Sequence, residues 1–224
     1  MTKLIIIDPI DATHEGPEVP VMGSDVEDQR LHLRQGDIDG ACGPYCLFMA
    51  LMICGVARRD EITGSPFEIH GNSRLAKAFK LMEEYSALFR HGTDLKDLEK
   101  FVNNTYKKKV KAELCHDRGV SLRPFIEEHI KQDHPVILGL DWGGVDGHWV
   151  LVIGLEYLVD SNGYETIWRY LVLDPSEPSS KVCAWNSVIE ATGSGGIYPY
   201  VWWKDYDMKV QFDECMALMS TWLA

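Results

Sequence analysis

Three long runs of β-branched and aromatic residues in the second half of the chain limit the folds that this sequence can adopt. They are residues 135–142 (PVILGLDW), 148–159 (HWVLVIGLEYLV) and 165–173 (ETIWRYLVL). Such residues favour strands, and the Asn162-Gly163 pair between the last two runs is the strongest short signal for a hairpin turn. The last two runs are therefore predicted to pair as neighbouring antiparallel strands.

The first half shows helical rather than strand periodicity. Residues 44–57 are apolar on every side, which predicts a helix buried inside the domain. Three more helices are expected to begin near Ser73, Thr93 and Ser121, where apolar residues recur at helical spacing. A mainly helical first half followed by an antiparallel sheet predicts the α+β class, with the buried helix packed on the sheet.

The two ends of the chain differ from this central part. Residues 1–33 include a stretch rich in Pro, Asp, Glu and Gly and are interpreted as an extended lead-in. The run 181–185 (KVCAW) is predicted to be a short strand, and residues 187–224 to add an extra strand and a terminal helix beginning at Asp213. Without an internal repeat or a clear linker, residues 1–224 are predicted to form one domain.

Charge and composition narrow the choice of partners. The net charge is −12, with 46% hydrophobic and 25% charged residues. Nucleic acids and anionic membranes favour clustered Lys and Arg, so neither is expected as the main partner. The first apolar run, Leu4–Ile7, is too short for a signal core or a membrane span. A cytoplasmic location is therefore expected, with delivery by a secretion machine as an alternative.

The six cysteines are predicted to be reduced thiols. They include no CxxC pair and no regular disulfide framework, and paired ligands of the kind that zinc needs are not found among them. No metal or other cofactor is expected. Cys46 and Cys54 fall within the buried apolar helix and are most simply core residues.

Cys42 differs from the other cysteines because it lies where the buried helix is expected to begin. Gly40 and Gly43 flank it, and Pro44 suits the first turn of a helix. Free amide groups and the helix dipole at such a position lower a thiol pKa and favour the thiolate. Cys42 is therefore a candidate nucleophile, although the same position suits a small apolar residue at the start of a buried helix.

A thiolate nucleophile needs a base and a group that orients the base. His148 opens an apolar strand after the glycine-rich loop WGGVDG, and Asp174 ends the run 165–173. The hairpin at Asn162-Gly163 would make these strands neighbours, so that Asp174 could orient the His148 imidazole. His134 is the closest competing base, and the other histidines, among them His32 and His129, are predicted to lie on the surface.

Three motifs in this order resemble the bacteriocin-processing peptidase family, whose members cut leader peptides after two glycines and have a papain-like fold. The motifs are RQGDIDGACGPYCLFMAL, GHWVLVIGL and YLVLDPS, and the resemblance extends over residues 34–186. It implies a cysteine peptidase in which Cys42 is the nucleophile, His148 the base and Asp174 the third triad member, with Gln35 in the oxyanion hole.

Two spacings depart from the family pattern. Gln35 is seven positions before Cys42, one more than the family pattern, and His148 and Asp174 are separated by 26 positions. The sequence contains no transporter segment of the kind that usually accompanies this family, so the leader substrate does not follow from the resemblance.

The favoured hypothesis is a cysteine peptidase or amidase that acts on a peptide or protein substrate through an acyl-enzyme. A toxin or effector that cuts a host protein or a peptidoglycan peptide, with an inhibitor or immunity protein as partner, is an alternative, and so is an acyltransferase or transglutaminase with the same triad. An inactive binding module is a further alternative, since the tryptophans at 202 and 203 could line a partner surface instead of packing in the core.

Overall fold

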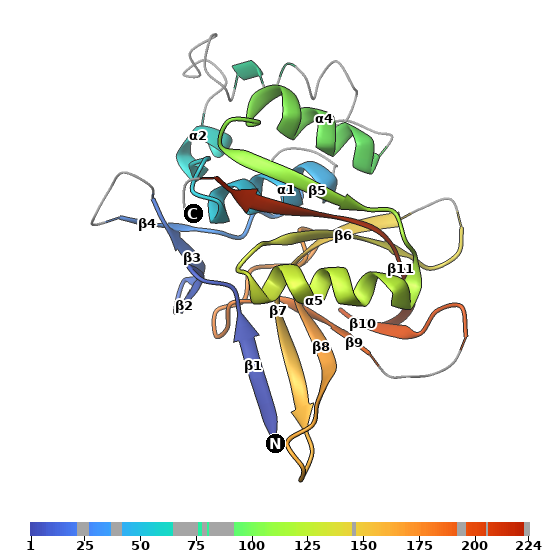
Figure 1. Cartoon of the computed structure of the whole chain (residues 1–224). Coiled ribbons are helices and arrows are strands. Elements are labelled where there is room, and N and C mark those ends of the chain that lie inside the picture. The colour runs from blue at the N-terminus through green and yellow to red at the C-terminus, as the bar shows by residue number, and fades with distance from the viewer. Residues whose placement is uncertain are drawn as a thin grey trace.

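The centre of the molecule is a closed antiparallel barrel of six strands (Figure 1). The computed structural model describes residues 1–21, 27–36, 42–64, 76–77, 80, 92–144, 147–191, 196–204 and 206–221. The barrel strands are β6 (Val136–Asp141), β7 (Gly147–Val159), β8 (Glu165–Leu173), β9 (Ser187–Glu190), β10 (Tyr200–Trp203) and β11 (Asp207–Ser220). Their order around the barrel is β7-β6-β11-β10-β9-β8, and it closes because β8 also pairs with β7.

The two longest strands, β7 and β11, each extend beyond the barrel and pair there with an additional strand. β1 (Thr2–Ile6) pairs with the second half of β7, where β6 no longer reaches. β5 (Val110–Cys115) pairs with the last residues of β11, beyond the segment that pairs with β10. Figure 1 shows β1 and the β7–β8 hairpin extending downward together from the barrel.

Register shifts occur along both long strands. In β7 they lie between Val152 and Gly154 and between Glu156 and Tyr157, and in β11 between Phe212 and Cys215. An irregularity of this kind adds a residue on one strand, bends it and increases its twist. A closed barrel needs such bending, because its strands must tilt and curve to meet.

The helices cover the barrel and complete its core. They are α1 (Cys42–Ile53), α2 (Arg59–Thr63), α4 (Leu95–Thr105) and α5 (Arg123–Lys131), with the short 3-10 helix η1 (Gly119–Leu122) before α5. Both α1 and α5 contact β6 and β7, and α4 contacts β5 and β11. Residues 43–53 of α1 are all buried, as predicted from the apolar sequence. The middle of β7 is buried continuously because helices cover the face that does not point into the barrel.

The predicted fold class is wrong. The structure is mostly β and is organised around a closed barrel, not around a helical first half packed on a sheet in a papain-like layout. Residues 1–33 contain four strands, since β1 joins β7 and a separate three-stranded sheet is built from β2 (Asp11–Thr13), β3 (Gly16–Pro20) and β4 (Asp28–Arg30). The helix expected after Ser73 falls mostly outside the described residues. Pairing with distant strands, which local periodicity does not report, decides the layout.

The predicted terminal helix is also wrong, because residues 207–220 form β11. Met, Ala and Leu in this segment favour a helix in isolation, but β11 pairs with β5, β6 and β10, and its residues 215–218 are buried. The run 181–185 is not a strand, and there the Ser180 hydroxyl accepts hydrogen bonds from the amides of Val182 and Cys183. Such side-chain bonds to local amides compete with strand pairing.

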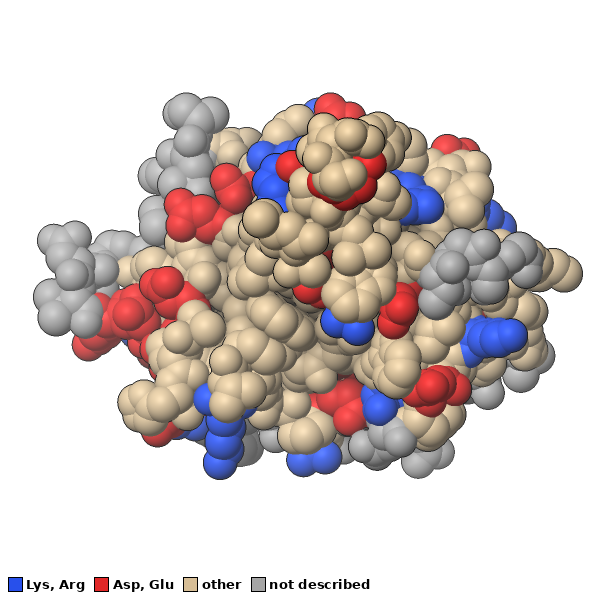
Figure 2. Space-filling model, turned by 90° about the horizontal axis from the view of Figure 1, so that it is seen from below, with Lys and Arg blue, Asp and Glu red and all other residues tan. Residues whose placement is uncertain are grey.

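On the face shown in Figure 2, the Lys and Arg side chains of the described residues are interspersed with Asp and Glu and do not gather into one patch. Among the described residues, no helix is both long enough and apolar enough to cross a membrane.

Candidate active site

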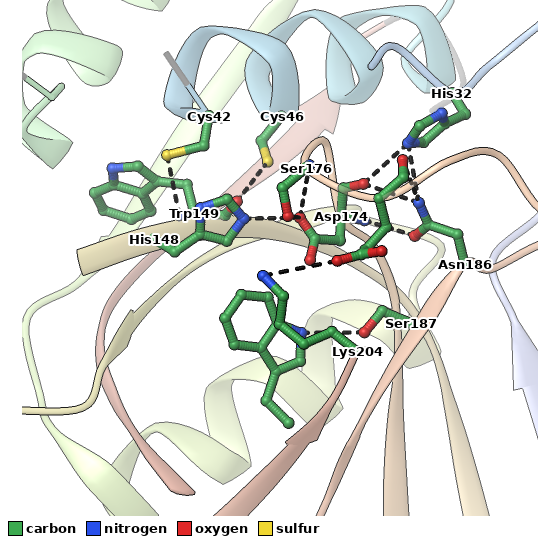
Figure 3. A network of polar contacts seen from close by, with 12 residues as sticks. His32, Cys42, Cys46, His148, Trp149, Asp174, Ser176, Asn186, Ser187 and Lys204 are labelled. Atoms are coloured by element: carbon green, nitrogen blue, oxygen red, sulfur yellow. Dashed lines mark hydrogen bonds and ion pairs between the residues drawn. The ribbon is translucent and has the colours of Figure 1, made fainter. Parts of the chain in front are cut away.

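Cys42 is the first residue of α1, as its position shortly before Pro44 predicts. Its side chain is half-buried. Gly43 follows it in a tight space, where an added Cβ would lie 3.1 Å from Cβ of Thr93 and 3.2 Å from Cδ1 of Trp149. A glycine here therefore lets the start of α1 approach β7 closely. The helix start places the Cys42 side chain beside the first residues of β7 (Figure 3).

His148, the second residue of β7, connects the thiol to a buried carboxylate. Its Nε2 lies 2.7 Å from Oδ1 of Asp174, and its side chain also hydrogen-bonds to the Cys42 thiol. Because Nε2 is occupied by Asp174, Nδ1 is the ring nitrogen that remains for the thiol. The pairing of β7 with β8 brings these groups together, since Asp174 directly follows β8. The three residues form a continuous chain of thiol, imidazole and carboxylate.

Asp174 is fully buried, and its turn is held by several polar contacts. Its Oδ1 accepts hydrogen bonds from the amide and the hydroxyl of Ser176, both at 2.8 Å, in addition to the contact with His148. Its backbone amide donates to Oδ1 of Asn186 at 2.7 Å, and its carbonyl accepts from the Asn186 side-chain amide at 2.8 Å. These contacts determine the direction of the carboxylate.

The structure adds two residues that the sequence analysis did not select. Asn186 spans the Asp174 turn, and His32, predicted to be on the surface, is 6% exposed with Nε2 at 3.0 Å from the Asp174 carbonyl oxygen. Leu31, His32 and Leu33 alternate between apolar and polar residues, a pattern that predicts an exposed middle residue. In the structure all three residues are buried. No local pattern indicates Asn186, because its partner Asp174 lies in the turn after β8, 12 positions earlier in the chain.

An indole covers the imidazole from the barrel side. The ring of Trp202, on β10, lies 5.2 Å from that of His148 at an interplanar angle of 23°. The ammonium of Lys204 lies 4.3 Å from the centre of the Trp202 ring and 3.7 Å from Glu177. Trp202 is 1% exposed, in accord with core packing, whereas Trp203 is 42% exposed. The aromatic face can stabilise positive charge on the imidazole.

The environment of the three groups favours the charged pair. Burial alone would raise the pKa of the Cys42 thiol, but the hydrogen bond and charge of His148, with the amides of Trp149 and Gly43, lower it below its ordinary value. Burial alone would lower the pKa of His148, but its bonds to Asp174 and Cys42 raise it to about 9. Burial opposes ionisation of Asp174, yet its hydrogen bond and ion pair with His148 lower its pKa. The same contacts therefore favour the thiolate form of Cys42 and the imidazolium form of His148.

Gln35 lies beside the same turn. Its backbone amide donates a 2.6 Å hydrogen bond to the backbone carbonyl of Pro175. The backbone amide of Gly36 donates to the hydroxyl of Tyr45 on α1 at 3.2 Å. Residues 37–41 lie outside the described residues. These two hydrogen bonds keep Gln35 next to the Asp174 turn and its neighbour Gly36 next to α1, despite the extra residue in the spacing.

The remaining thiols have other environments. Cys46 and Cys54 are buried in α1, as predicted, and burial raises the pKa of each. His134, the competing base, is half-buried away from this site, and its Nδ1 lies 3.2 Å from Nδ1 of His129. His129 is buried, although it was predicted to be on the surface. Within the described residues no group of three or more His, Cys, Asp or Glu is arranged to hold a metal ion.

Comparisons with known proteins leave the family open. No family model matches the sequence, and no curated protein matches it, so the resemblance to the bacteriocin-processing family has no support beyond its motifs. The structure is similar to the crystal structure of UfSP from C. elegans, with a TM-score of 0.46 and 15% sequence identity. The similarity covers 96% of this chain and 34% of that one, so this chain spans about a third of its length. A likeness of this degree supports no conclusion about activity.

Proposed function

We propose that the protein is a cysteine peptidase or amidase that hydrolyses an amide bond through an acyl-enzyme. The observation that carries the proposal is the chain of Cys42, His148 and Asp174, in which a thiol at a helix start meets an imidazole that is bonded to a buried carboxylate. This is the arrangement of nucleophile, base and orienting group that acyl transfer requires. A peptide or protein is the proposed substrate.

In the first step the Cys42 thiolate attacks the carbonyl carbon of the substrate and forms a tetrahedral intermediate. The imidazolium of His148 then donates its Nδ1 proton to the leaving amine, the C–N bond breaks, and the acyl group remains on the Cys42 sulfur. In the second step neutral His148 removes a proton from water, which attacks the thioester and releases the carboxylic acid. Asp174 accepts a hydrogen bond from Nε2 throughout and holds the ring in one orientation.

The negative oxygen of each intermediate needs hydrogen-bond donors. We assign this role to the backbone amide of Cys42, which is free of a helical partner at the first turn, and to the side chain of Gln35. The hydrogen bond from the backbone amide of Gln35 to the carbonyl of Pro175 supports the assignment, because it keeps Gln35 beside the triad. Replacing Gln35 with Ala is expected to slow turnover by about 10²–10³-fold without abolishing it.

Labelling with a peptide that carries an electrophilic group tests the proposal directly. We expect the probe to modify Cys42 near neutral pH and to leave Cys183 largely unmodified, although both thiols are half-buried. Cys42→Ala should abolish labelling and turnover, and His148→Ala should slow both, whereas Cys183→Ala serves as the matched control. Equal labelling of Cys42 and Cys183 in the wild-type protein would show that the thiol is not activated.

Mass spectrometry of products formed with an added primary amine distinguishes hydrolysis from acyl transfer. A free acid as the main product supports the peptidase, whereas a new amide would identify an acyltransferase with the same nucleophile.

A further inference from the structure

A second thiol contacts the same residue as the proposed nucleophile. Cys46 lies one helical turn after Cys42 on α1, is fully buried, and donates a hydrogen bond from Sγ to the backbone carbonyl of Trp149 at 3.3 Å. The amide of Trp149 in turn donates to Sγ of Cys42, also at 3.3 Å. The backbone N–H and C=O of one residue on β7 are therefore bonded to two thiols on one face of α1 (Figure 3).

The sheet explains why both backbone groups of Trp149 face the helix. Trp149 lies opposite Gly139 of β6 in the antiparallel register. In an antiparallel strand the N–H and C=O of one residue point to the same side. Both backbone groups of Trp149 contact thiols of α1, so neither of them pairs with Gly139. Because backbone polar groups need partners when they are buried, the two thiols replace a neighbouring strand at this position.

The Trp149 side chain is held as well. Its Nε1 donates to the carbonyl of Thr93 at 2.8 Å, and its ring lies against Gly139, where an added Cβ would be 3.2 Å from Cζ3. The Trp149 side chain is thus held by Thr93 and by β6. The orientation of the Trp149 backbone carbonyl depends on the hydrogen bond from Cys46.

We propose that Cys46 is a positioning residue for the nucleophile, because its thiol holds the Trp149 backbone so that the Trp149 amide points at the Cys42 sulfur. An amide that donates to a thiolate is a charge-assisted bond, stronger than one between neutral groups. The inference rests on the proposed function only in taking Cys42 as the reactive thiol. It extends that function to a residue that takes no part in bond making or breaking.

Cys46 suits this role only if it remains a thiol while Cys42 is a thiolate. Burial raises the pKa of Cys46 well above its ordinary value, and the negative charges of Cys42 and Asp174 raise it further. It can therefore donate its proton to the carbonyl without adding a second negative charge beside Cys42. The other charged groups at the site are His148 and Asp174, and a change at position 46 leaves both in place.

The pH dependence of Cys42 alkylation by iodoacetamide tests the inference, with the modified residue identified by mass spectrometry. In Cys46→Ala we expect the midpoint to move to higher pH and the rate at pH 7 to fall by roughly three- to tenfold, as expected when a bond to a charged group weakens. Cys46→Ser keeps a donor and should stay within about twofold of the wild type. A pH midpoint that moves with Ala and returns with Ser is a result that altered packing alone would not give.

Cys54 provides the matched control. It is also buried on α1, and its Sγ lies 3.8 Å from the carbonyl oxygen of Leu218, away from the site. Cys54→Ala should lower stability without moving the midpoint for Cys42. If Cys46→Ala does not fold, Cys46→Val, which fills the space without a donor, gives the same comparison.

The inference is overturned if folded Cys46→Ala or Cys46→Val keeps the wild-type midpoint, or if Cys54→Ala shifts it equally. These outcomes differ from failure of the proposed function, which would appear in the wild-type protein as a Cys42 thiol no more reactive than Cys183.

Discussion

Asp174 shows how single side chains around the site support one another. A fully buried carboxylate is costly unless it is paired and hydrogen-bonded, and here Oδ1 receives three hydrogen bonds from His148 and Ser176. Asn186 bonds to both backbone groups of the same residue. Correct direction of the His148 ring therefore depends on a side chain that contacts neither His148 nor Cys42.

Replacing Asn186 with Ala should reveal this dependence. The substitution removes the side-chain partner of the Asp174 amide and one of the two side chains at its carbonyl, so we expect a loss of about 2 kcal/mol in the free energy of unfolding, measured with urea. Labelling of Cys42 by the peptide probe should slow by about tenfold, which corresponds to ~1.4 kcal/mol. Asn103→Ala, on the exposed surface of α4, is the control and should change neither quantity appreciably. An unchanged labelling rate in Asn186→Ala would contradict the positioning role.

The protonation of His148 should follow its partners. We expect NMR titration of the labelled imidazole to give a midpoint near pH 9, since bonds to Asp174 and Cys42 raise the pKa to about 9 against the effect of burial. Asp174→Asn removes the carboxylate charge, so the midpoint should move to lower pH. Loss of the imidazolium also removes the proton donor for the leaving group, and turnover should decline as the pH rises through about 9. A titration midpoint that Asp174→Asn leaves in place would show that the carboxylate does not control the charge of the ring.

At the scale of elements, the long strands β7 and β11 do more than form the barrel wall. β7 carries His148 near its beginning, contacts α1 through Trp149, and provides the edge on which β1 docks. The end of the strand that carries His148 and the end that pairs with β1 are separate, because β6 covers the first half and β1 the second. Changes at the β1 end are therefore expected to alter stability and leave the thiol chemistry intact.

Gly154→Ala tests this separation. A Cβ at this position would lie 2.5 Å from the backbone carbonyl oxygen of Ile5, so β1 must shift. We expect a loss of about 1–3 kcal/mol in the free energy of unfolding, with the pH profile of Cys42 alkylation unchanged. Leu158→Ala, exposed on the same strand, should cost less than about 0.5 kcal/mol. An altered alkylation profile in Gly154→Ala would mean that the docking of β1 and the site are coupled.

For the whole molecule, the titrating groups together determine how stability depends on pH. Burial lowers the pKa of both His129 and His134, so below the ordinary value of 6.5 the unfolded chain binds more protons and stability falls as the pH falls. Cys42 and His148 behave as a pair. The raised pKa of His148 lets the folded chain keep a proton that the unfolded chain releases between pH 6.5 and 9, so its stabilising effect is lost as the pH rises. The lowered pKa of the Cys42 thiol acts in the opposite direction, so the two effects oppose each other.

We therefore predict that the free energy of unfolding declines as the pH falls below 6.5. Between pH 6.5 and 9 we expect the opposing effects of Cys42 and His148 to give a weaker pH dependence than His148 alone would give. Urea unfolding at several pH values measures this curve. His134→Gln should reduce the slope below pH 6.5, since one of the two histidines with a lowered pKa is removed, whereas His14→Gln, with a side chain that is 92% exposed, should not. The same slope in wild type and His134→Gln would exclude the histidine pair as its cause.

The sequence alone indicated those parts of the molecule that depend on neighbouring residues. The buried helix that starts at Cys42 and the strands joined through Asn162-Gly163 follow from apolar patterning and turn chemistry, and the structure confirms both. Once these strands pair, His148 and Asp174 must approach each other, and for this reason three side chains far apart in the chain could be selected in advance. Their catalytic roles stay predictions that the labelling experiment tests.

The tertiary structure alone decided which distant segments pair. Closure of the barrel, conversion of the expected terminal helix into β11 and burial of His32 depend on contacts between residues far apart in the chain. The same holds for Asn186 at the Asp174 turn and for Cys46 at Trp149, whose local surroundings in the sequence are unremarkable. Local patterning reports what a segment prefers by itself, but the partner strand and the buried polar groups determine which preference prevails.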